Sequence, residues 1–392
     1  MPGMDAGAED WQNGGFALYV HWPFCESKCP YCDFNSYVEK SVDHALWSNA
    51  LVAQIEAMGR LLPGRILDSI FFGGGTPSLM EPETVHRVIA AARNGWGTRN
   101  TLEVTLEANP SSVEAGRFVA YRDAGVNRVS LGIQALDDRA LRLLGRLHTV
   151  REALQAWDVA NQVFGRTSFD LIYARQEQGL EEWRKELESA LALRPTHLSL
   201  YQLTIEDGTA FGERYRLGRL TNLPDDDLSA DLYSLTQDIC SSAGLPQYEI
   251  SNHALPGNES HHNCVYWRYG DYVGVGPGAH GRITVNGQRN SQVNARNPSA
   301  WLSQMRDERT MFGDMEPLSA EEQAREYLLM SLRLVEGTDL ERYRRIGGTD
   351  LRPQSIDNLV DLGLLWAREK RIGATPDGRP LLNAILAELI QD

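Results

Sequence analysis

Six short apolar runs, each followed by a longer stretch with helical spacing, restrict the fold of this chain more than any other feature. Runs rich in β-branched and aromatic residues predict strands, and apolar residues three or four positions apart predict helices. The predicted strands cover residues 17–22, 68–74, 102–109, 128–134, 167–174 and 197–204. Successive strand–helix units give parallel strands joined by right-handed crossovers. An open doubly wound sheet and a partial barrel both fit, and both place ligands at the carboxyl ends of strands.

Between the predicted strands, three segments carry clear helix signals. Residues 43–61 repeat apolar side chains at helical spacing, and residues 81–92 begin with first-turn residues around a proline. Residues 111–125 start with Ser111 and Glu114, a capping-box pair, and end at a glycine. We predict one helix in each of these segments.

From about residue 315 the pattern changes to that of a smaller module. Helical spacing covers residues 319–334, 339–347 and 355–365, a hairpin is expected to turn at residues 376–378, and residues 384–390 close the chain as a helix. Three helices and a hairpin suggest a winged-helix-like domain, with a packing or substrate-lid role favoured over DNA binding. The expected divisions are a tail at 1–16, the barrel at 17–240, a connection completing the barrel at 241–314 and this domain at 315–392.

Charge and cysteine content narrow the classes of partner and compartment. The net charge of −15 argues against nucleic acid as a partner, which usually requires a basic footprint. The first residues lack a secretory signal, and no apolar run approaches the ~20 residues of a membrane span. We expect a cytoplasmic protein without a membrane span, and leave peripheral membrane association open. Five cysteines, an odd number, favour metal or redox chemistry over a disulfide framework.

Three of those cysteines lie together as C-x3-C-x2-C, at Cys25, Cys29 and Cys32. Zinc sites usually need a second pair of ligands, whereas Cys240 and Cys264 stand alone. Three thiolates in a short loop can hold three irons of a [4Fe–4S] cluster and leave the fourth iron open to another ligand. The spacing therefore favours an iron–sulfur cluster over zinc, and over buried thiols without a ligand.

The same residues carry a resemblance to the radical S-adenosylmethionine (SAM) superfamily, whose signature is C-x3-C-x2-C with an aromatic residue, here Tyr31, before the last cysteine. The resemblance implies a partial (β/α)6 parallel barrel and a cluster whose open iron is chelated by the amino and carboxylate groups of SAM. It narrows to the oxygen-independent coproporphyrinogen III oxidases (HemN) and the related HemW-type haem chaperones. It spans nearly the whole chain, from "LYVHWPFC" through "GGGTPS", "LEANP" and "SLGIQ" to "YWRYGDYVGVGPGAHG".

Polar and glycine residues at the strand ends are the candidates for holding SAM. The glycines of "FFGGGTPS" let backbone approach a ligand, although a tight turn explains them equally well. A carboxylate ending an apolar strand is costly unless it is paired, so a capping role or a salt bridge is the plain alternative for Glu107. Arg146 could be a solvated helix charge, and Tyr19 an ordinary strand aromatic. The resemblance assigns SAM contacts to Tyr19, Tyr31, Gly74, Gly75, Thr76, Glu107, Gln134, Arg146 and Asp170.

A histidine–tyrosine–tryptophan segment, "HHNCVYW" at 261–267, lies beyond the predicted barrel units. We expect an exposed loop here, in which histidines are often merely solvated. Imidazole is also a common haem ligand, and Tyr266 and Trp267 could stack on a porphyrin. The segment is similar to the H-N-x-x-Y-W motif of HemW-type proteins, and that similarity implies haem binding by His262.

Two departures from the oxidase pattern decide among the functions that the resemblance allows. Phe34 stands where those enzymes carry a fourth cysteine, and only 24 residues precede Cys25 where they have a longer extension. Both features favour a haem chaperone that binds haem, a [4Fe–4S] cluster and SAM and delivers haem to respiratory haemoproteins. The alternatives are oxidative decarboxylation of coproporphyrinogen III, a related radical SAM methyl transfer, and a zinc-stabilised binding protein.

Overall fold

The protein is described by a computed structural model that covers residues 9–307 and 309–390. A twelve-stranded sheet forms its centre, in the order β14-β13-β12-β11-β1-β4-β5-β6-β7-β8-β10-β9. The bounds in chain order are β1 (Phe16–Trp22), β4 (Ile66–Gly74), β5 (Gly97–Ala108), β6 (Arg128–Gln134), β7 (Arg166–Tyr173), β8 (His197–Gln202), β9 (Gln247–Glu249), β10 (Asn252–Ala254), β11 (Asp271–Val275), β12 (His280–Val285), β13 (Gln288–Val293) and β14 (Asp314–Pro317).

The six predicted strands are confirmed as parallel neighbours in chain order, from β1 to β8. A further parallel strand, β11, was not predicted and pairs with the other side of β1. Beyond β11, the strands β12, β13 and β14 add in antiparallel fashion, and β10 and β9 do so at the opposite edge. Because the order begins at β14 and ends at β9, the sheet stays open over the described residues, which makes it a partial barrel.

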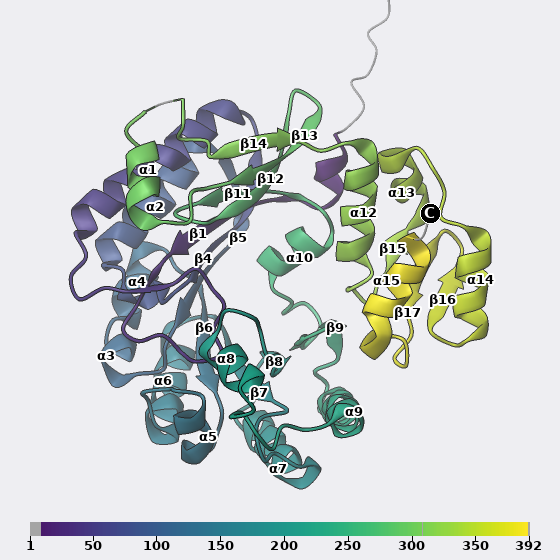
Figure 1. Cartoon of the computed structure of the whole chain (residues 1–392). Helices are drawn as coiled ribbons and strands as arrows, with labels where there is room; N and C mark the ends of the chain where they lie inside the picture. Colours follow the sequence, from purple (N-terminus) through teal and green to yellow (C-terminus); the bar gives the residue numbers. More distant parts are fainter. Residues whose placement is uncertain (1–8, 308, 391–392) are drawn as a thin grey trace, which may run out of the picture.

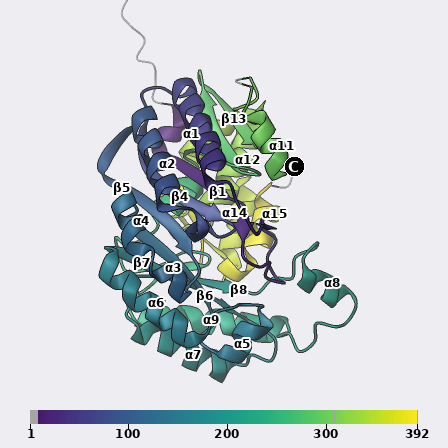
Figure 2. The same ribbon diagram turned by 90° about the vertical axis from the view of Figure 1, so that its left-hand side faces the viewer.

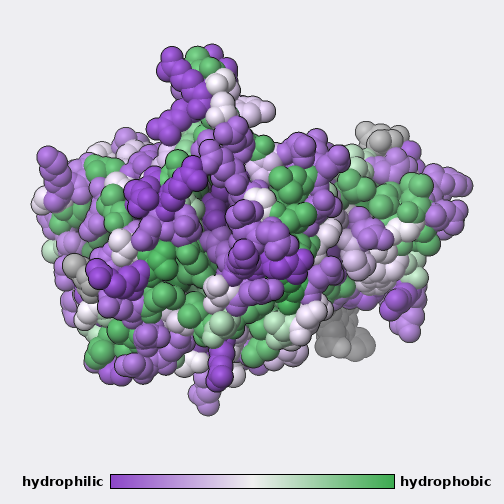
Figure 3. Space-filling view, turned by 90° about the horizontal axis from the view of Figure 1, so that it is seen from below, coloured by the Kyte–Doolittle hydropathy of each residue, from purple (hydrophilic) through white to green (hydrophobic). Residues whose placement is uncertain are grey.

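Helices cover the outer face of this sheet, as Figures 1 and 2 show. Those around the barrel are α1 (His44–Leu61), α2 (Pro82–Gly95), α3 (Ser112–Ala115), α4 (Phe118–Ala124), α5 (Asp138–Leu143), α6 (Val150–Val163), α7 (Leu180–Ala192), α9 (Asp226–Ser242) and α11 (Pro298–Gln304). The face of the molecule seen from below carries mostly hydrophilic side chains, with hydrophobic ones in separate groups between them (Figure 3). The short helix α8 (Ala210–Arg216) instead projects from the barrel (Figure 2).

The predicted helix at 111–125 is two helices, α3 and α4. Ser111 Oγ accepts the backbone N–H of Glu114 at 3.3 Å, as a capping residue should. The Glu114 carboxylate turns away, however, and accepts from the backbone N–H of Asn109 at 2.9 Å. The capping box is therefore only half formed. The C-terminal prediction is confirmed, because Gly125 ends α4 in the left-handed conformation with φ 113°.

The two faces of the barrel strands differ in chemistry. Large apolar side chains point outward and pack under the helices, among them Phe72, Leu106, Leu131, Phe169 and Leu200. The inner positions of five successive strands carry small buried hydroxyls, at Ser69, Thr105, Ser130, Ser168 and Ser199. Closed barrels usually fill such positions with bulky branched residues. Small inner side chains leave room for a ligand and offer it hydrogen-bonding groups.

The C-terminal part has a hydrophobic core of its own, which includes Leu328, Leu359, Ile372 and Ile385. It comprises α12 (Ala320–Ser331), β15 (Thr338–Asp339), α13 (Leu340–Gly347), α14 (Pro353–Asp361), β16 (Leu365–Arg368), β17 (Arg371–Ala374), the 3-10 helix η3 (Arg379–Leu381) and α15 (Leu382–Ile390). The strands form a small antiparallel sheet in the order β15-β17-β16. Helix α10 (His261–Trp267) lies between this part and the barrel (Figure 1).

The C-terminal hairpin turns at a different place from the one expected. The expected hairpin turn at 376–378 is wrong: β16 and β17 are joined at Glu369 and Lys370, with Glu369 at φ 51°.

Within the expected tail, residues 1–8 lie outside the described part, but Asp10–Asn13 forms a 3-10 helix, η1. Asp10 also pairs with Arg342 of α13 at 2.8 Å. In the part of the chain that the structure describes, no helix is long and apolar enough to cross a membrane.

Candidate metal and cofactor site

The three clustered cysteines lie in a loop at the carboxyl end of β1. Cys25 ends the short strand β2 (Phe24–Cys25), which pairs in parallel with β3 (Tyr37–Val38), so the chain between them closes into a loop that carries Cys29 and Cys32. This is the edge at which parallel sheets bind ligands. Backbone bonds brace the loop, with Tyr37 N donating to the carbonyl oxygen of Pro23 at 2.7 Å.

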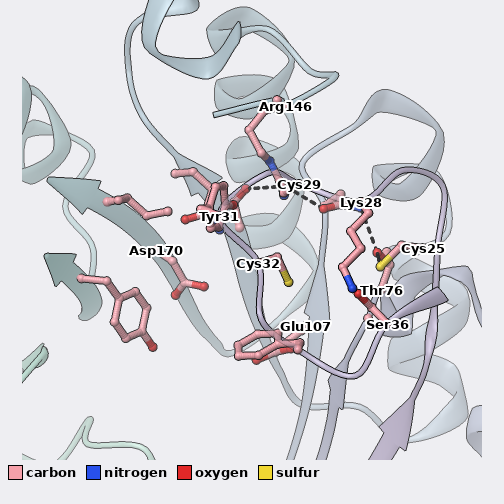
Figure 4. Close-up of a pocket in the computed structure, with 18 of the residues that line it drawn as sticks. Cys25, Lys28, Cys29, Tyr31, Cys32, Ser36, Thr76, Glu107, Arg146 and Asp170 are labelled. Carbon is pink, nitrogen blue, oxygen red and sulfur yellow. Dashed lines mark hydrogen bonds between the residues drawn. The ribbon is translucent and has the colours of Figure 1, made fainter. Parts of the chain in front are cut away.

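A cavity of about 590 Å³ opens beside this loop. Except for Tyr19, every residue predicted to hold the cluster or SAM lines it: Cys25, Cys29, Tyr31, Cys32, Gly74, Gly75, Thr76, Glu107, Gln134, Arg146 and Asp170. His262, predicted to bind haem, does not line it. Figure 4 shows the cysteine loop on one side of this space and the two carboxylates, Glu107 and Asp170, on the other. Residues from five strands and the loop thus meet where the sequence predicted.

Polar groups approach two of the thiols. Thr76 Oγ1 donates to Cys25 Sγ, and a guanidinium nitrogen of Arg146 donates to Cys29 Sγ, each at 3.4 Å. Burial raises the pKa of the Cys25 and Cys32 thiols, an effect that a bound metal reverses because it holds cysteine as thiolate. The hydrogen bonds would then stabilise thiolate charge, so these residues fit an iron–sulfur cluster.

A single metal ion fits the site less well. No group of three or more His, Cys, Asp or Glu side chains in the described residues is arranged to hold one. A zinc ion needs its ligands to converge on one point, whereas the thiolates of a cluster bind different irons. The remaining cysteines, Cys240 and Cys264, are buried in α9 and α10 away from the cavity, and burial raises the pKa of each thiol to about 12.

The glycines at the end of β4 allow a tight turn and also bring their backbone to the cavity. Gly74 adopts φ 110°, and a Cβ atom there would lie 2.6 Å from the His21 ring. A Cβ on Gly75 would lie 2.8 Å from the carbonyl oxygen of Phe24. Glycine is therefore required for the close approach of this turn to the start of the cysteine loop. Both residues also line the cavity, so their backbone groups can reach a ligand.

Two carboxyl groups reach the cavity without a cationic partner. Burial, followed by the charge of Asp170, raises the pKa of Glu107 to about 8. Burial also raises the pKa of Asp170 to about 6, against the opposing effects of the Ser199 hydroxyl and Arg128. Neither carboxyl forms an ion pair within the described residues, so the salt-bridge alternative for Glu107 is wrong. A cationic or hydroxyl-bearing ligand would supply the missing partner.

Arg146 is not a solvated helix charge. It follows α5 in a turn and donates to Asn109 Oδ1 at 2.7 Å and to the carbonyl oxygen of Gly132 at 3.0 Å. Its Nε atom is buried without a partner. Asn109, which the sequence analysis did not single out, also donates to Thr76 Oγ1 at 3.4 Å and so links two predicted residues. Its position directly after β5, beside Glu107, was the available signal.

Tyr19 lies behind the cavity and supports the loop through a neighbour. Its hydroxyl is 3.1 Å from His21 Nδ1, and His21 Nε2 is 2.9 Å from the carbonyl oxygen of Asn35. A carbonyl only accepts, so Nε2 carries the proton and Nδ1 accepts from Tyr19. Contact of Tyr19 with SAM stays a prediction.

His262 is not an exposed loop residue, which corrects that expectation. It lies in the first turn of α10 and is 1% exposed. Its Nδ1 atom is 2.9 Å from Ser69 Oγ, its Nε2 atom is 2.6 Å from the Tyr266 hydroxyl, and its ring stacks on Phe71 at 4.9 Å. Burial lowers the pKa of His262 to about 3, so the ring is neutral. Haem binding by His262 stays a prediction, and in this conformation both ring nitrogens are engaged.

Comparisons with known proteins agree with this geometry. The radical SAM superfamily pattern matches residues 19–190, and the HemN C-terminal domain matches residues 318–381. Haem chaperone HemW of Escherichia coli is 36% identical and aligns with 94% of this chain and 97% of its own. The chain therefore belongs to the radical SAM superfamily, in the family of HemN and HemW. The mitochondrial radical S-adenosyl methionine domain-containing protein 1 of Bos taurus is 38% identical over 95% of this chain and 87% of its own.

Among solved structures, coproporphyrinogen III oxidase (HemN) from Escherichia coli has the same fold, with a TM-score of 0.80, 21% identity and coverage of 97% of this chain and 92% of that one. Membership of the superfamily implies a [4Fe–4S] cluster and SAM as cofactors. The alignment with HemN extends beyond the barrel to the C-terminal helices, so both parts of the fold are shared.

Proposed function

We propose that this protein is a haem chaperone that binds a [4Fe–4S] cluster, SAM and haem, and that passes haem to respiratory haemoproteins. The observation that carries the proposal is the similarity to HemW of Escherichia coli over nearly the full length of both chains. Phe34 supports it from within the site: it lines the cavity, 57% exposed, at the position where the oxidases have a fourth cysteine.

Each part of the cavity has a role in this proposal. Cys25, Cys29 and Cys32 would hold the cluster, which would supply an open iron position for SAM and, when reduced, an electron for cleavage of a carbon–sulfur bond of SAM. Glu107 and Asp170 hold the polar groups of SAM, and Arg146 supports the loop through Cys29 and Asn109.

SAM binding tests this half of the proposal. Glu107→Ala and Asp170→Ala should each weaken SAM binding by roughly tenfold to a hundredfold, because charge-assisted hydrogen bonds are worth about 1.5–3 kcal/mol. The cluster should still assemble, since neither residue supplies a thiolate. Equilibrium binding to anaerobically reconstituted protein measures the effect, and unchanged affinity in both variants would remove these residues from the SAM site.

The second candidate is an enzyme that oxidatively decarboxylates coproporphyrinogen III. The observation in its favour is the fold shared with HemN, including the C-terminal part. Incubation of reconstituted protein with SAM, a reductant and coproporphyrinogen III separates the two functions. The chaperone forms no protoporphyrinogen but binds haem stoichiometrically. Turnover without haem binding would replace the chaperone proposal with the enzyme.

The proposal also covers where in the cell the protein acts and which kind of protein accepts its haem. A cytoplasmic protein would meet respiratory haemoproteins at the inner side of their membrane, which requires at most peripheral contact. Relatives whose names include the word mitochondrial exist, so fractionation of the native source is the appropriate test. Transfer of bound haem to an apo-haemoprotein, followed by the Soret band of the acceptor, tests delivery itself.

A further inference from the structure

Arg128 is a buried cation that lacks a carboxylate partner. It begins β6, is 3% exposed and points into the barrel below the cavity. Its guanidinium donates to Thr105 Oγ1 at 3.4 Å and to Ser168 Oγ at 2.9 Å, and no ion pair involves it within the described residues. Other buried arginines are paired, since Arg65 and Arg289 both contact the carboxylate of Asp271. A buried unpaired charge is costly, so its retention requires a reason.

Hydrogen bonds lead from this cation to the cavity. Arg128 donates to Ser168 Oγ, Ser168 Oγ donates to Ser130 Oγ at 2.9 Å, and Ser130 Oγ donates to Asp170 Oδ1 at 3.3 Å. This direction agrees with the donor capacities of the groups, because a guanidinium can only donate and each hydroxyl donates its one proton to the next oxygen. The strand register holds the links together: Ser130 of β6 lies opposite Ser168 of β7. At the end of the chain, Asp170 Oδ1 accepts from the Ser130 hydroxyl, which favours the ionised carboxylate.

We propose that Arg128 is a positioning residue, which acts through Ser168 and Ser130 to keep the Asp170 carboxylate ionised and aimed into the cavity. Arg128 does not itself line the cavity. The inference rests on the proposed role of Asp170 in binding SAM. It adds that residues on the inner face of the barrel, outside the cavity, contribute to that binding. Polarised hydroxyls in a low dielectric transmit the influence of the cation over a longer distance than a direct ion pair spans.

The charge environment of Asp170 agrees with this role. Burial raises the pKa of Asp170 to about 6, whereas Ser199, Arg128, Ser130 and Arg146 oppose that rise. Glu107 faces Asp170 from β5 and Tyr201 lies beside it on β8. The groups that determine its protonation are therefore Glu107, Arg128, Ser130, Arg146, Ser199 and Tyr201. Removal of the cation should raise the pKa of Asp170 further, so that a larger fraction of it is protonated between pH 6 and pH 7.

Two titrations of the full chain test the proposal. The first follows the Asp170 carboxyl carbon by NMR in cluster-free protein labelled with ¹³C-aspartate, with Asp170→Asn to assign the signal. Arg128→Met should shift its midpoint upward by about one pH unit, since an opposite charge lowers a carboxyl pKa by roughly one to three units. Ser130→Ala should shift it in the same direction. Thr105→Val is the matched control, because it removes the other hydroxyl on Arg128, outside the chain, and should leave the midpoint unchanged.

The second titration measures SAM affinity of the cluster-loaded, oxidised protein against pH. Arg128→Met should lower affinity about fivefold near pH 6, where a one-unit shift takes the ionised fraction of Asp170 from about one half to about one tenth, and should restore it at higher pH, where Asp170 ionises again. In an Asp170→Asn background, Arg128→Met should have no further effect, and the remaining pH dependence belongs to Glu107. A uniform loss at every pH, with no midpoint shift, would mean a merely structural role and would overturn the proposal.

The two titrations separate the proposal from the function on which it rests. If wild type fails to bind SAM, the cofactor role fails, while the carboxyl titration still decides whether the chain governs Asp170. If Arg128→Met does not fold, Ser130→Ala alone carries the test, since it removes one hydroxyl and leaves the cation in place. Wild-type midpoints in every variant that folds overturn the proposal.

Discussion

The Nε2 atom of His262 lies 2.6 Å from the hydroxyl oxygen of Tyr266, one helical turn further along α10. Ser69 occupies the other ring nitrogen at 2.9 Å. An imidazole needs a free nitrogen to bind iron, so haem could bind His262 only if one of these hydrogen bonds is broken. For haem bound through Nε2, Tyr266 and the iron would compete for the same atom.

This competition predicts opposite effects of two substitutions on haem affinity. His262→Ala should lower it, because the iron loses its ligand. Tyr266→Phe should raise it by roughly two- to tenfold, because a net hydrogen bond of about 0.5–1.5 kcal/mol no longer has to be broken. Haem titration followed by the Soret band measures both.

His261→Ala is the matched control for these variants, since its side chain is exposed at the start of α10. It should bind haem like wild type. A loss of affinity in Tyr266→Phe would show that the tyrosine contributes to haem binding directly, and wild-type binding by His262→Ala would exclude the histidine as the ligand.

The sequence predicted the barrel well because its signals are local. Each of the six predicted strands is a short run rich in β-branched, aromatic and leucine residues, and Gly125 marks a helix end that the structure confirms. β11 was missed because Asp271–Val275 is short and contains glycine, and only its pairing with β1 makes it part of the sheet. The hairpin turn was misplaced because "PDG" is a strong turn signal, whereas the actual turn places Glu369 at positive φ without a glycine.

The site residues also divide into those that local sequence signals predict and those that only long-range contacts bring into place. The cysteines and strand-end residues follow directly from spacing and from the carboxyl-end rule, so nearly all of them meet at the cavity. His262 was predicted as exposed because its polar neighbours suggest a loop, whereas contact with Ser69 and Phe71, almost 200 positions earlier, buries it. Arg128 and Asn109 were not singled out, because their contacts with Ser168 and Arg146 join segments far apart in the sequence and appear only in the fold.

Substitution of the clustered cysteines should separate them from the two solitary ones. Cys25→Ala, Cys29→Ala and Cys32→Ala should each abolish the visible charge-transfer absorbance of reconstituted protein, because each removes one of three thiolates. Cys240→Ala and Cys264→Ala should retain it, since both lie outside the cavity. Iron and sulfide analysis provides the check, and stoichiometric zinc without sulfide in anaerobically prepared wild type would contradict the radical SAM assignment of the site.

Gly74 should not tolerate a side chain, because a Cβ atom there would clash with His21. Gly64, which has positive φ but open space around it, separates this clash from backbone strain. Gly74→Ala places a Cβ atom 2.6 Å from the ring of His21, which is itself held by Tyr19 and Asn35. Gly64 also has positive φ, at 75°, but a Cβ there would meet nothing within 4 Å. Gly64→Ala should therefore cost only about 1 kcal/mol of backbone strain, and Gly74→Ala about 2–4 kcal/mol. Urea unfolding measures the difference, and equal losses would show that the contact with His21 is unimportant.

Glu107 should make the cluster-free protein less stable as pH rises. Its pKa is raised to about 8 in the folded chain, mainly by burial, from the ordinary value of 4.5. Between these two values the folded state holds a proton that the unfolded state has released, so the free energy of unfolding falls with increasing pH. Glu107→Gln mimics the neutral carboxyl and should flatten the decline between pH 5 and pH 8, by an amount on the order of 1–4 kcal/mol. Denaturation series at several pH values measure the slopes.

Glu369→Gln, an exposed surface change, is the control and should keep the wild-type slope. Parallel slopes for wild type and Glu107→Gln would mean that Glu107 is ionised in the folded protein, and its part in SAM binding would then be that of a permanent anion.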